Sequence, residues 1–64
     1  MVRINGEEKD VQGMLLEQYL ADEGYARERI AVECNGEIVP RADYGTRVLQ
    51  DRDVLEIVSF VGGG

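Results

Sequence analysis

Residues 30–39 read IAVECNGEIV, and this pattern predicts a β-hairpin. Its first half alternates apolar residues with polar or small ones, as a strand with one buried face does. Asn35-Gly36 supplies the positive φ angles that a two-residue hairpin turn requires. Pro40 ends the returning strand, because proline lacks the amide hydrogen that a strand ladder uses. The inward side chains of the first strand are expected to be Ile30, Val32 and Cys34.

The segment that follows, residues 41–50, has no regular pattern, so we expect an irregular connection with one short 3₁₀ turn. Val48 and Leu49 are its apolar anchors. Asp51-Arg52-Asp53 is expected to turn the chain into a last strand, which is predicted over residues 54–60 or 54–61.

That last strand is apolar on both faces, unlike the alternating strands of a half-solvated sheet. We expect Glu56 to point to solvent. Leu55, Ile57 and Ser59 then face the core, because side chains alternate along a strand. An exposed apolar patch rimmed by charge is typical of a docking surface, and we favour docking over the alternative that loops or a crystal or dimer contact cover this face. The candidate partner-docking residues on it are Val54, Val58 and Phe60.

The N-terminal residues predict a second hairpin. Val2 and Ile4 alternate with Arg3, and Asn5-Gly6 follows as the turn. The returning residues 7–9 are few and charged, so a strand there lies at the sheet edge or hardly forms.

Residues 10–23 predict the single main helix, of about three and a half turns. Asp10 can cap its N-terminus by accepting from the amides of Gln12 or Gly13. Gly24 is a natural stop in the left-handed conformation. The apolar side chains that fall on one arc of this helix are Val11, Leu15, Leu16, Tyr19 and Leu20.

Two hairpins with one helix between them, and a last strand that returns to the centre, predict an α+β fold of the β-grasp type. We expect a mixed four- to five-stranded sheet packed on one main helix, as a single domain over residues 1–64. The first and last strands should pair in parallel, since a long connection with a crossover element joins them.

Composition narrows the possible functions. The net charge of −6 argues against a nucleic-acid partner, whose phosphates require a basic face. The chain has no histidine, so it lacks the commonest general base and metal ligand, and an enzyme is not expected. One cysteine and no long apolar run predict a reduced, cytoplasmic protein without a membrane partner. Cys34 is interpreted as a small buried hydrophobe rather than a reactive thiol.

The chain ends in Gly62-Gly63-Gly64, directly after the apolar strand. Glycine has no Cβ, so we expect a flexible tail over residues 61–64 that can enter a channel too narrow for a side chain. Gly64 carries the α-carboxylate, which no side chain hinders. The alternative is a frayed chain end without a role.

Together these features resemble the ThiS family, the small sulfur carriers of thiamin thiazole biosynthesis, which are ubiquitin-like in fold. The resemblance spans nearly the whole chain in the expected order. It departs from the family at Arg52, where a D-G-D turn is usual, at Gly13 within the expected helix, and at Cys34. The matching elements are Asn5-Gly6, Leu15-Leu16, Ala31-Val32-Glu33, Asn35-Gly36, Ile38-Val39-Pro40-Arg41, Asp51, Asp53 and Val61-Gly62-Gly63-Gly64.

The resemblance implies that this chain carries chemistry performed by its partners. An E1-like (ThiF-like) enzyme would use ATP to adenylate the Gly64 carboxylate. A persulfide donor such as a cysteine desulfurase would then convert the adenylate to a thiocarboxylate, which a ThiG-like thiazole synthase consumes. Gly62 and Gly63 would thread into the partner, and the chain itself would bind no cofactor.

Three other functions remain open on the sequence. The same tail suits a carrier for molybdopterin or for a cysteine or methionine pathway, or a ubiquitin-like modifier conjugated to lysines. A different class is a non-covalent β-grasp interaction module with an incidental glycine tail.

Overall fold

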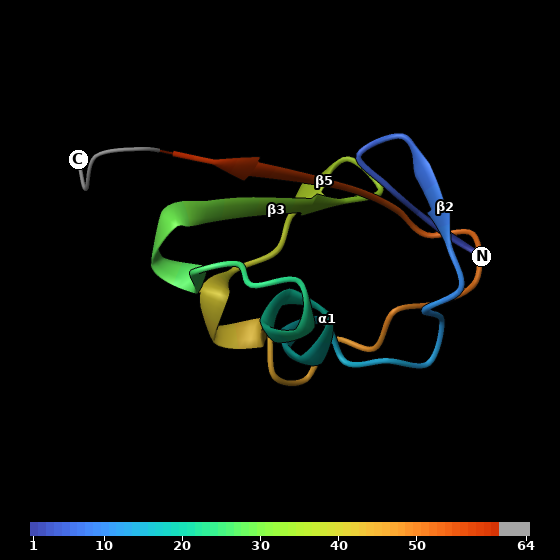
Figure 1. The fold of residues 1–64 in the computed structure, drawn as a ribbon, viewed down its shortest axis with the longest axis horizontal. Coiled ribbons are helices and arrows are strands. Elements are labelled where there is room, and N and C mark those ends of the chain that lie inside the picture. The colour runs from blue at the N-terminus through green and yellow to red at the C-terminus, as the bar shows by residue number, and fades with distance from the viewer. Residues whose placement is uncertain (61–64) are drawn as a thin grey trace.

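The computed structural model describes residues 1–60 as a five-stranded mixed sheet packed against one helix (Figure 1). Figure 1 shows α1 lying against one face of the sheet, with β5 ending far from the N-terminus. The predicted α+β fold is therefore confirmed. The elements are β1 (Val2–Ile4), β2 (Glu7–Lys9), α1 (Leu16–Asp22), η1 (Arg27–Arg29), β3 (Ile30–Cys34), β4 (Glu37–Ile38), η2 (Arg41–Asp43) and β5 (Val54–Ser59).

The strand order is β2-β1-β5-β3-β4, with β5 in the centre. β1 and β5 pair in parallel, and β3 pairs antiparallel with both β4 and β5. This is the pairing that the sequence predicts for the first and last strands, because the helix and the second hairpin lie on the connection between them.

Both predicted hairpin turns form at the Asn-Gly dipeptides. Asn5 and Gly6 have φ angles of 51° and 84°, and Asn35 and Gly36 have 53° and 86°. Two successive residues with positive φ match the type I′ turn, whose twist suits the flanking strands. β2 does form, as a three-residue edge strand of charged residues, and such residues discourage pairing with another chain.

The predicted start of the helix is wrong. α1 begins at Leu16, with Leu15 in an extended conformation before it. Gly13 has a φ of 90°, and its amide donates to the carbonyl of Leu49 at 2.7 Å. The amide of Leu49 donates in turn to Met14 at 2.8 Å, so this backbone bonds across to the irregular segment rather than along a helix. Asp10 accepts from the Gln12 side chain and caps no helix.

The predicted end of the helix is confirmed. Gly24 has a φ of 77°, and its amide donates to Ala21 at 3.1 Å. The amide of Tyr25 reaches back to Leu20 at 2.9 Å. These two bonds define a Schellman motif, which satisfies the last helical carbonyls and turns the chain toward β3.

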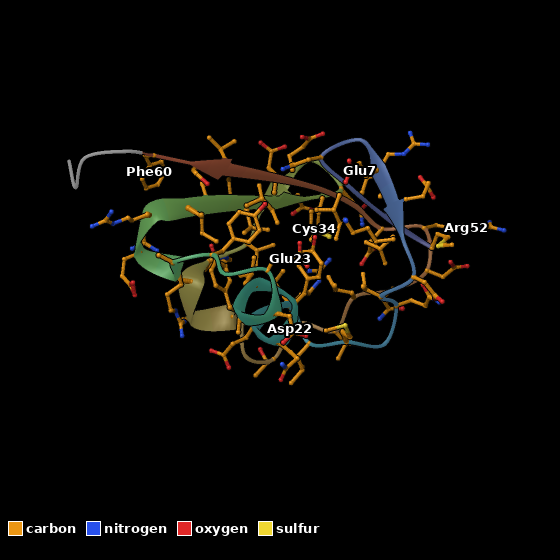
Figure 2. All side chains as sticks on the ribbon, in the orientation of Figure 1. Glu7, Asp22, Glu23, Cys34, Arg52 and Phe60 are labelled. Carbon is orange, nitrogen blue, oxygen red and sulfur yellow. The ribbon has the colours of Figure 1, made fainter. Side chains whose placement is uncertain are left out.

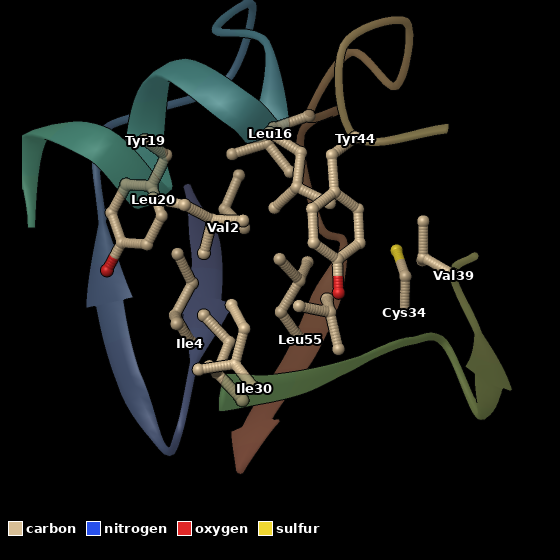
Figure 3. Packing of buried hydrophobic residues seen from close by; sticks show 13 residues of the cluster. Val2, Ile4, Leu16, Tyr19, Leu20, Ile30, Cys34, Val39, Tyr44 and Leu55 are labelled. Atoms are coloured by element: carbon tan, nitrogen blue, oxygen red, sulfur yellow. The ribbon is translucent and has the colours of Figure 1, made fainter. Parts of the chain in front are cut away.

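The core lies between α1 and the inner face of the sheet, and Tyr44 is its largest fully buried side chain. Figure 3 shows the Tyr44 ring reaching from the irregular segment toward Leu55 of β5. Val48 and Leu49 were predicted as the apolar anchors of this segment, and Tyr44 was not. Leu49 is buried, but Val48 is 42% exposed. The buried hydrophobic residues are Val2, Ile4, Leu16, Tyr19, Leu20, Ile30, Val32, Cys34, Val39, Tyr44, Leu49, Leu55 and Ile57.

Candidate functional site

The central strand β5 carries the candidate docking residues, and both of its neighbours hold it in place. β3 pairs with β5 along five residues, from Ile30 opposite Ser59 to Cys34 opposite Leu55. β1 pairs with a shorter part of β5, because this pairing ends at Ile4 opposite Leu55. The rest of β5 on that side would therefore lack a backbone partner from β1.

The side chain of Asn5 continues the ladder where β1 stops. The amide of Ile57 donates to Asn5 Oδ1 at 2.7 Å, and Asn5 Nδ2 donates to the Ile57 carbonyl at 3.2 Å. The Asn5 backbone amide also donates to the carbonyl of Leu55 at 3.0 Å. The turn residue thus replaces a strand residue and fixes β5 further along its length.

Asn35 of the other hairpin turn binds the opposite side of β5 at its start. Its backbone amide donates to the Val54 carbonyl at 2.8 Å, and its Oδ1 accepts from the Val54 amide at 2.9 Å. Its Nδ2 donates to Asp53 Oδ1 at 3.0 Å. The second oxygen of Asp53 accepts from the Gln50 amide at 2.9 Å, so this 7% exposed carboxylate is well bonded.

The turn before β5 places Arg52 in the left-handed region, with a φ of 74°. A residue with a Cβ is disfavoured there, which explains why a glycine suits this position in the D-x-D turn. The Arg52 amide donates to the Met1 carbonyl at 2.7 Å. The Met1 ammonium binds the Asp51 carboxylate and holds the pKa of that carboxyl below its ordinary value.

The orientation predicted for β5 is confirmed from Val54 to Val58. Leu55 and Ile57 are buried, whereas Val54 is 42% exposed and Val58 is 59% exposed. Ser59 was expected to face the core with Leu55 and Ile57, but it is exposed at the last position of β5. The large apolar side chains therefore do lie on a surface, and their role in docking stays a prediction.

Phe60 follows the end of β5 and remains tied to the sheet. Its amide donates to the carbonyl of Arg29 at 2.8 Å, and its side chain is 48% exposed. Figure 2 shows the ring at the carboxyl end of β5, far from the N-terminal hairpin. An exposed aromatic ring at this position could contact a partner next to the chain terminus.

The same sheet face extends beyond the predicted docking residues. The register places Glu33 opposite Ile38 on one side and opposite Glu56 on the other. It also places Ala31 opposite Val58. Ile38 is 65% exposed. The alternation of the hairpin, with Ile30, Val32 and Cys34 inward, was the signal that could have assigned Ile38 to the outer face. We call this surface the outer face; its residues are Arg3, Glu8, Ala31, Glu33, Ile38, Val54, Glu56 and Val58.

Cys34 lies on the inner face, as the alternation of residues 30–34 predicted (Figure 2). It is 4% exposed, and burial, followed by the nearby Asp53 carboxylate, raises the pKa of its thiol. Arg47 donates to the Cys34 sulfur at 3.0 Å. Both residues line a surface hollow of about 490 Å³. A buried thiol with a raised pKa is a poor nucleophile.

The remaining predicted site residues, Gly62, Gly63 and Gly64, lie outside the described residues, as does the expected tail as a whole. Within residues 1–60, no group of three or more histidine, cysteine, aspartate or glutamate side chains could hold a metal ion. No helix in that part of the chain is long and apolar enough to cross a membrane.

The chain is similar to known proteins in both sequence and structure. Residues 2–64 match the family model described as the ThiS family. The chain is 40% identical over 68 residues to the sulfur carrier protein ThiS of Bacillus subtilis, and the alignment covers all of both chains. The crystal structure of the thiamine biosynthesis protein ThiS from Geobacter metallireducens superposes with a TM-score of 0.74 at 27% identity. That superposition covers 98% of this chain and 97% of the other.

A further relative is a longer protein. The chain is 44% identical over 64 residues to the thiazole synthase of Magnetococcus marinus, with 98% of this chain aligned. The chain spans about a fifth of the length of that protein, since the alignment covers 20% of it.

Proposed function

Because the chain belongs to the ThiS family of sulfur carrier proteins, we propose that it carries sulfur as a thiocarboxylate on Gly64. The acceptor in this proposal is the thiazole ring formed in thiamin biosynthesis. The single observation that carries the proposal is the family match, which runs to residue 64 and so includes the terminal glycines.

The proposed chemistry starts with a carboxylate that is too poor an electrophile to react alone. A ThiF-like enzyme transfers AMP from ATP to the Gly64 carboxylate and releases pyrophosphate. The terminal sulfur of a donor persulfide, such as that of a cysteine desulfurase, then attacks the acyl carbon and displaces AMP. A thiol reductant breaks the resulting S–S bond and leaves the thiocarboxylate, a sulfur nucleophile.

In this account the folded domain positions the terminus and the partners perform the chemistry. Asn5 and Asn35 fix β5 from both sides, so the strand that leads to the terminus is held rigidly. Holding a reactive end in one orientation lowers the entropic cost of each encounter. Val54, Val58 and Phe60 dock on the partner, while Gly62 and Gly63 enter its active site.

The thiazole synthase partner is supported by the relative from Magnetococcus marinus. A segment of that thiazole synthase is similar to nearly the whole of this chain. We infer that the ThiG-like enzyme is the partner that consumes the thiocarboxylate. We also infer that ATP is used only by the activating enzyme, and that this chain acts in the cytoplasm as a co-substrate without a bound cofactor.

The experiment is a reconstitution of thiazole formation. It contains the ThiF-like enzyme and ThiG-like synthase of the same organism, ATP, a cysteine desulfurase with cysteine, a thiol reductant and the organic thiazole precursors. The full chain should supply sulfur to the product, and a chain lacking Gly63 and Gly64 should not. A thiocarboxylate that forms but is not consumed would assign the carrier to another sulfur pathway. Partner binding and activity that survive the truncation would indicate a non-covalent module instead.

A further inference from the structure

We propose that the outer face receives a partner surface that places a cationic side chain between Glu33 and Glu56, inside an apolar rim. This inference rests on the proposed function and deepens it, because it names the chemistry of the partner at the docking face. Arginine fits best, since its planar guanidinium can donate to both carboxylates at once.

The two carboxylates lie side by side on the outer face. Glu33 and Glu56 are direct cross-strand partners in the antiparallel pair of β3 and β5, and both are exposed. Like charges directly opposite each other in a sheet are unfavourable. No salt bridge or side-chain hydrogen bond within residues 1–60 involves either carboxylate. The pair therefore contributes nothing favourable to the isolated chain.

The arginine that the register places on the outer face is already engaged. The register places Arg3 opposite Val54 on one side and opposite Glu8 on the other. Arg3 Nε donates to Glu8 at 2.8 Å, which directs its charge toward the β2 edge. The charge that would neutralise Glu33 and Glu56 must therefore come from another molecule.

Exposed apolar side chains surround the two carboxylates. Along β5, Glu56 lies between Val54 and Val58 on the same face, and across β3 the next residue in the register is Ile38. These three apolar side chains are 42%, 59% and 65% exposed. When a partner covers them, water leaves the neighbourhood of the carboxylates, and the attraction to a partner cation strengthens.

This arrangement makes opposite predictions for folding and for binding. Glu33→Gln or Glu56→Gln removes the cross-strand repulsion, so each variant should unfold at a higher urea concentration than the wild type. Glu56→Lys should stabilise the chain further, because it creates an opposite-charge pair with Glu33. The same three variants should bind the partner more weakly. A residue with a merely structural role would move stability and binding in the same direction.

The test uses the full chain as substrate of the ThiF-like enzyme, with pyrophosphate release as the readout. We expect the KM for Glu33→Gln/Glu56→Gln to rise about tenfold, the effect of losing one interfacial charge pair of modest strength. The kcat should not change, because neither residue touches the reacting atoms. The salt dependence of the KM should also become shallower. The control is Asp22→Asn/Glu23→Gln, which removes two exposed carboxylates at the end of α1, the helix that packs on the opposite face of the sheet (Figure 2).

The outcomes separate the two proposals. Adenylation of the wild type with unchanged KM values for the glutamine variants would overturn this inference and leave the proposed function intact. The same holds if Asp22→Asn/Glu23→Gln raises the KM as much as Glu33→Gln/Glu56→Gln does, since net charge alone would then explain the effect. Failure of the enzyme to adenylate the wild type would overturn the proposed function, and this inference with it.

Discussion

Asn5 and Ile57 exchange two hydrogen bonds, side chain to backbone, at the point where β1 has already turned away from β5. The Asn5 φ of 51° is part of the same arrangement, because the turn conformation aims the side chain at the central strand. One residue therefore makes the hairpin turn and extends the sheet.

The contribution of Asn5 can be separated into its two parts. Asn5→Gly keeps the turn but loses both hydrogen bonds, so the free energy of unfolding should fall by about 2 kcal/mol. Asn5→Ala should lower the free energy of unfolding by about 1–2 kcal/mol more than Asn5→Gly, because alanine is strained at positive φ. Urea unfolding at equilibrium measures both. An Asn5→Gly variant as stable as the wild type would show that the two bonds to Ile57 contribute nothing.

Arg52 offers a stabilising substitution. Its φ of 74° disfavours any residue with a Cβ, so Arg52→Gly should raise the free energy of unfolding by about 0.5–1 kcal/mol after the entropic cost of glycine. The matched control is Arg29→Gly, since Arg29 is not among the residues with positive φ and should lose stability. An equal loss of unfolding free energy in Arg52→Gly and Arg29→Gly would contradict this account of the turn.

The sheet was predictable from the sequence because its signals are local. The Asn-Gly turns, the alternation in residues 30–34 and the apolar last strand each depend on neighbouring residues. The helix start was not predictable, since the Gly13 amide bonds to Leu49, thirty-six positions away. The periodic apolar residues before Leu16 favoured a helix, and long-range pairing overrode them.

The residues of the candidate site were predictable only in part, because some of them are placed by contacts between distant parts of the sequence. The alternation along β5 correctly predicted that Val54 and Val58 are exposed. Asp53 and Tyr44 are polar or amphipathic residues in irregular segments, and no pattern marks such residues as buried. The burial of Asp53 depends on its hydrogen bond from Asn35. The burial of Tyr44 depends on its packing in the core under α1.

Cys34 should be protected from alkylation. In the native chain at pH 8, iodoacetamide should label it at least about a hundredfold more slowly than in urea, since labelling requires an opening that costs roughly 3 kcal/mol. Intact mass spectrometry follows the reaction. Rapid labelling of the folded chain would mean that the thiol is accessible and reactive.

Burial also gives Cys34 a pH signature. Because the pKa of the thiol is raised from 9.0 in the folded state, its contribution to stability is complete below pH 9. The contribution is lost as the pH rises from 9 through the folded pKa. The stability difference between the wild type and Cys34→Ala should therefore narrow above pH 9. A difference that stays constant to pH 11 would contradict the raised pKa.

Docking through β5 can be tested with a matched pair of valines. Val54 and Val48 are both 42% exposed, but only Val54 lies on the outer face. Val54→Asp should raise the KM for adenylation by the ThiF-like enzyme about tenfold, because it places a charge in an apolar contact. Val48→Asp should leave the KM close to that of the wild type. Equal effects of the two substitutions would remove β5 from the interface.

The central claim is that Gly64 carries the sulfur, and mass spectrometry of the chain tests it most directly. The chain is incubated with the ThiF-like enzyme, ATP, a cysteine desulfurase, cysteine and a thiol reductant, and the intact mass is then measured. We predict the mass increase of one oxygen-to-sulfur exchange, with fragmentation assigning it to Gly64. An unchanged mass with an enzyme that activates its own carrier, or sulfur found on Cys34 instead, would contradict the account.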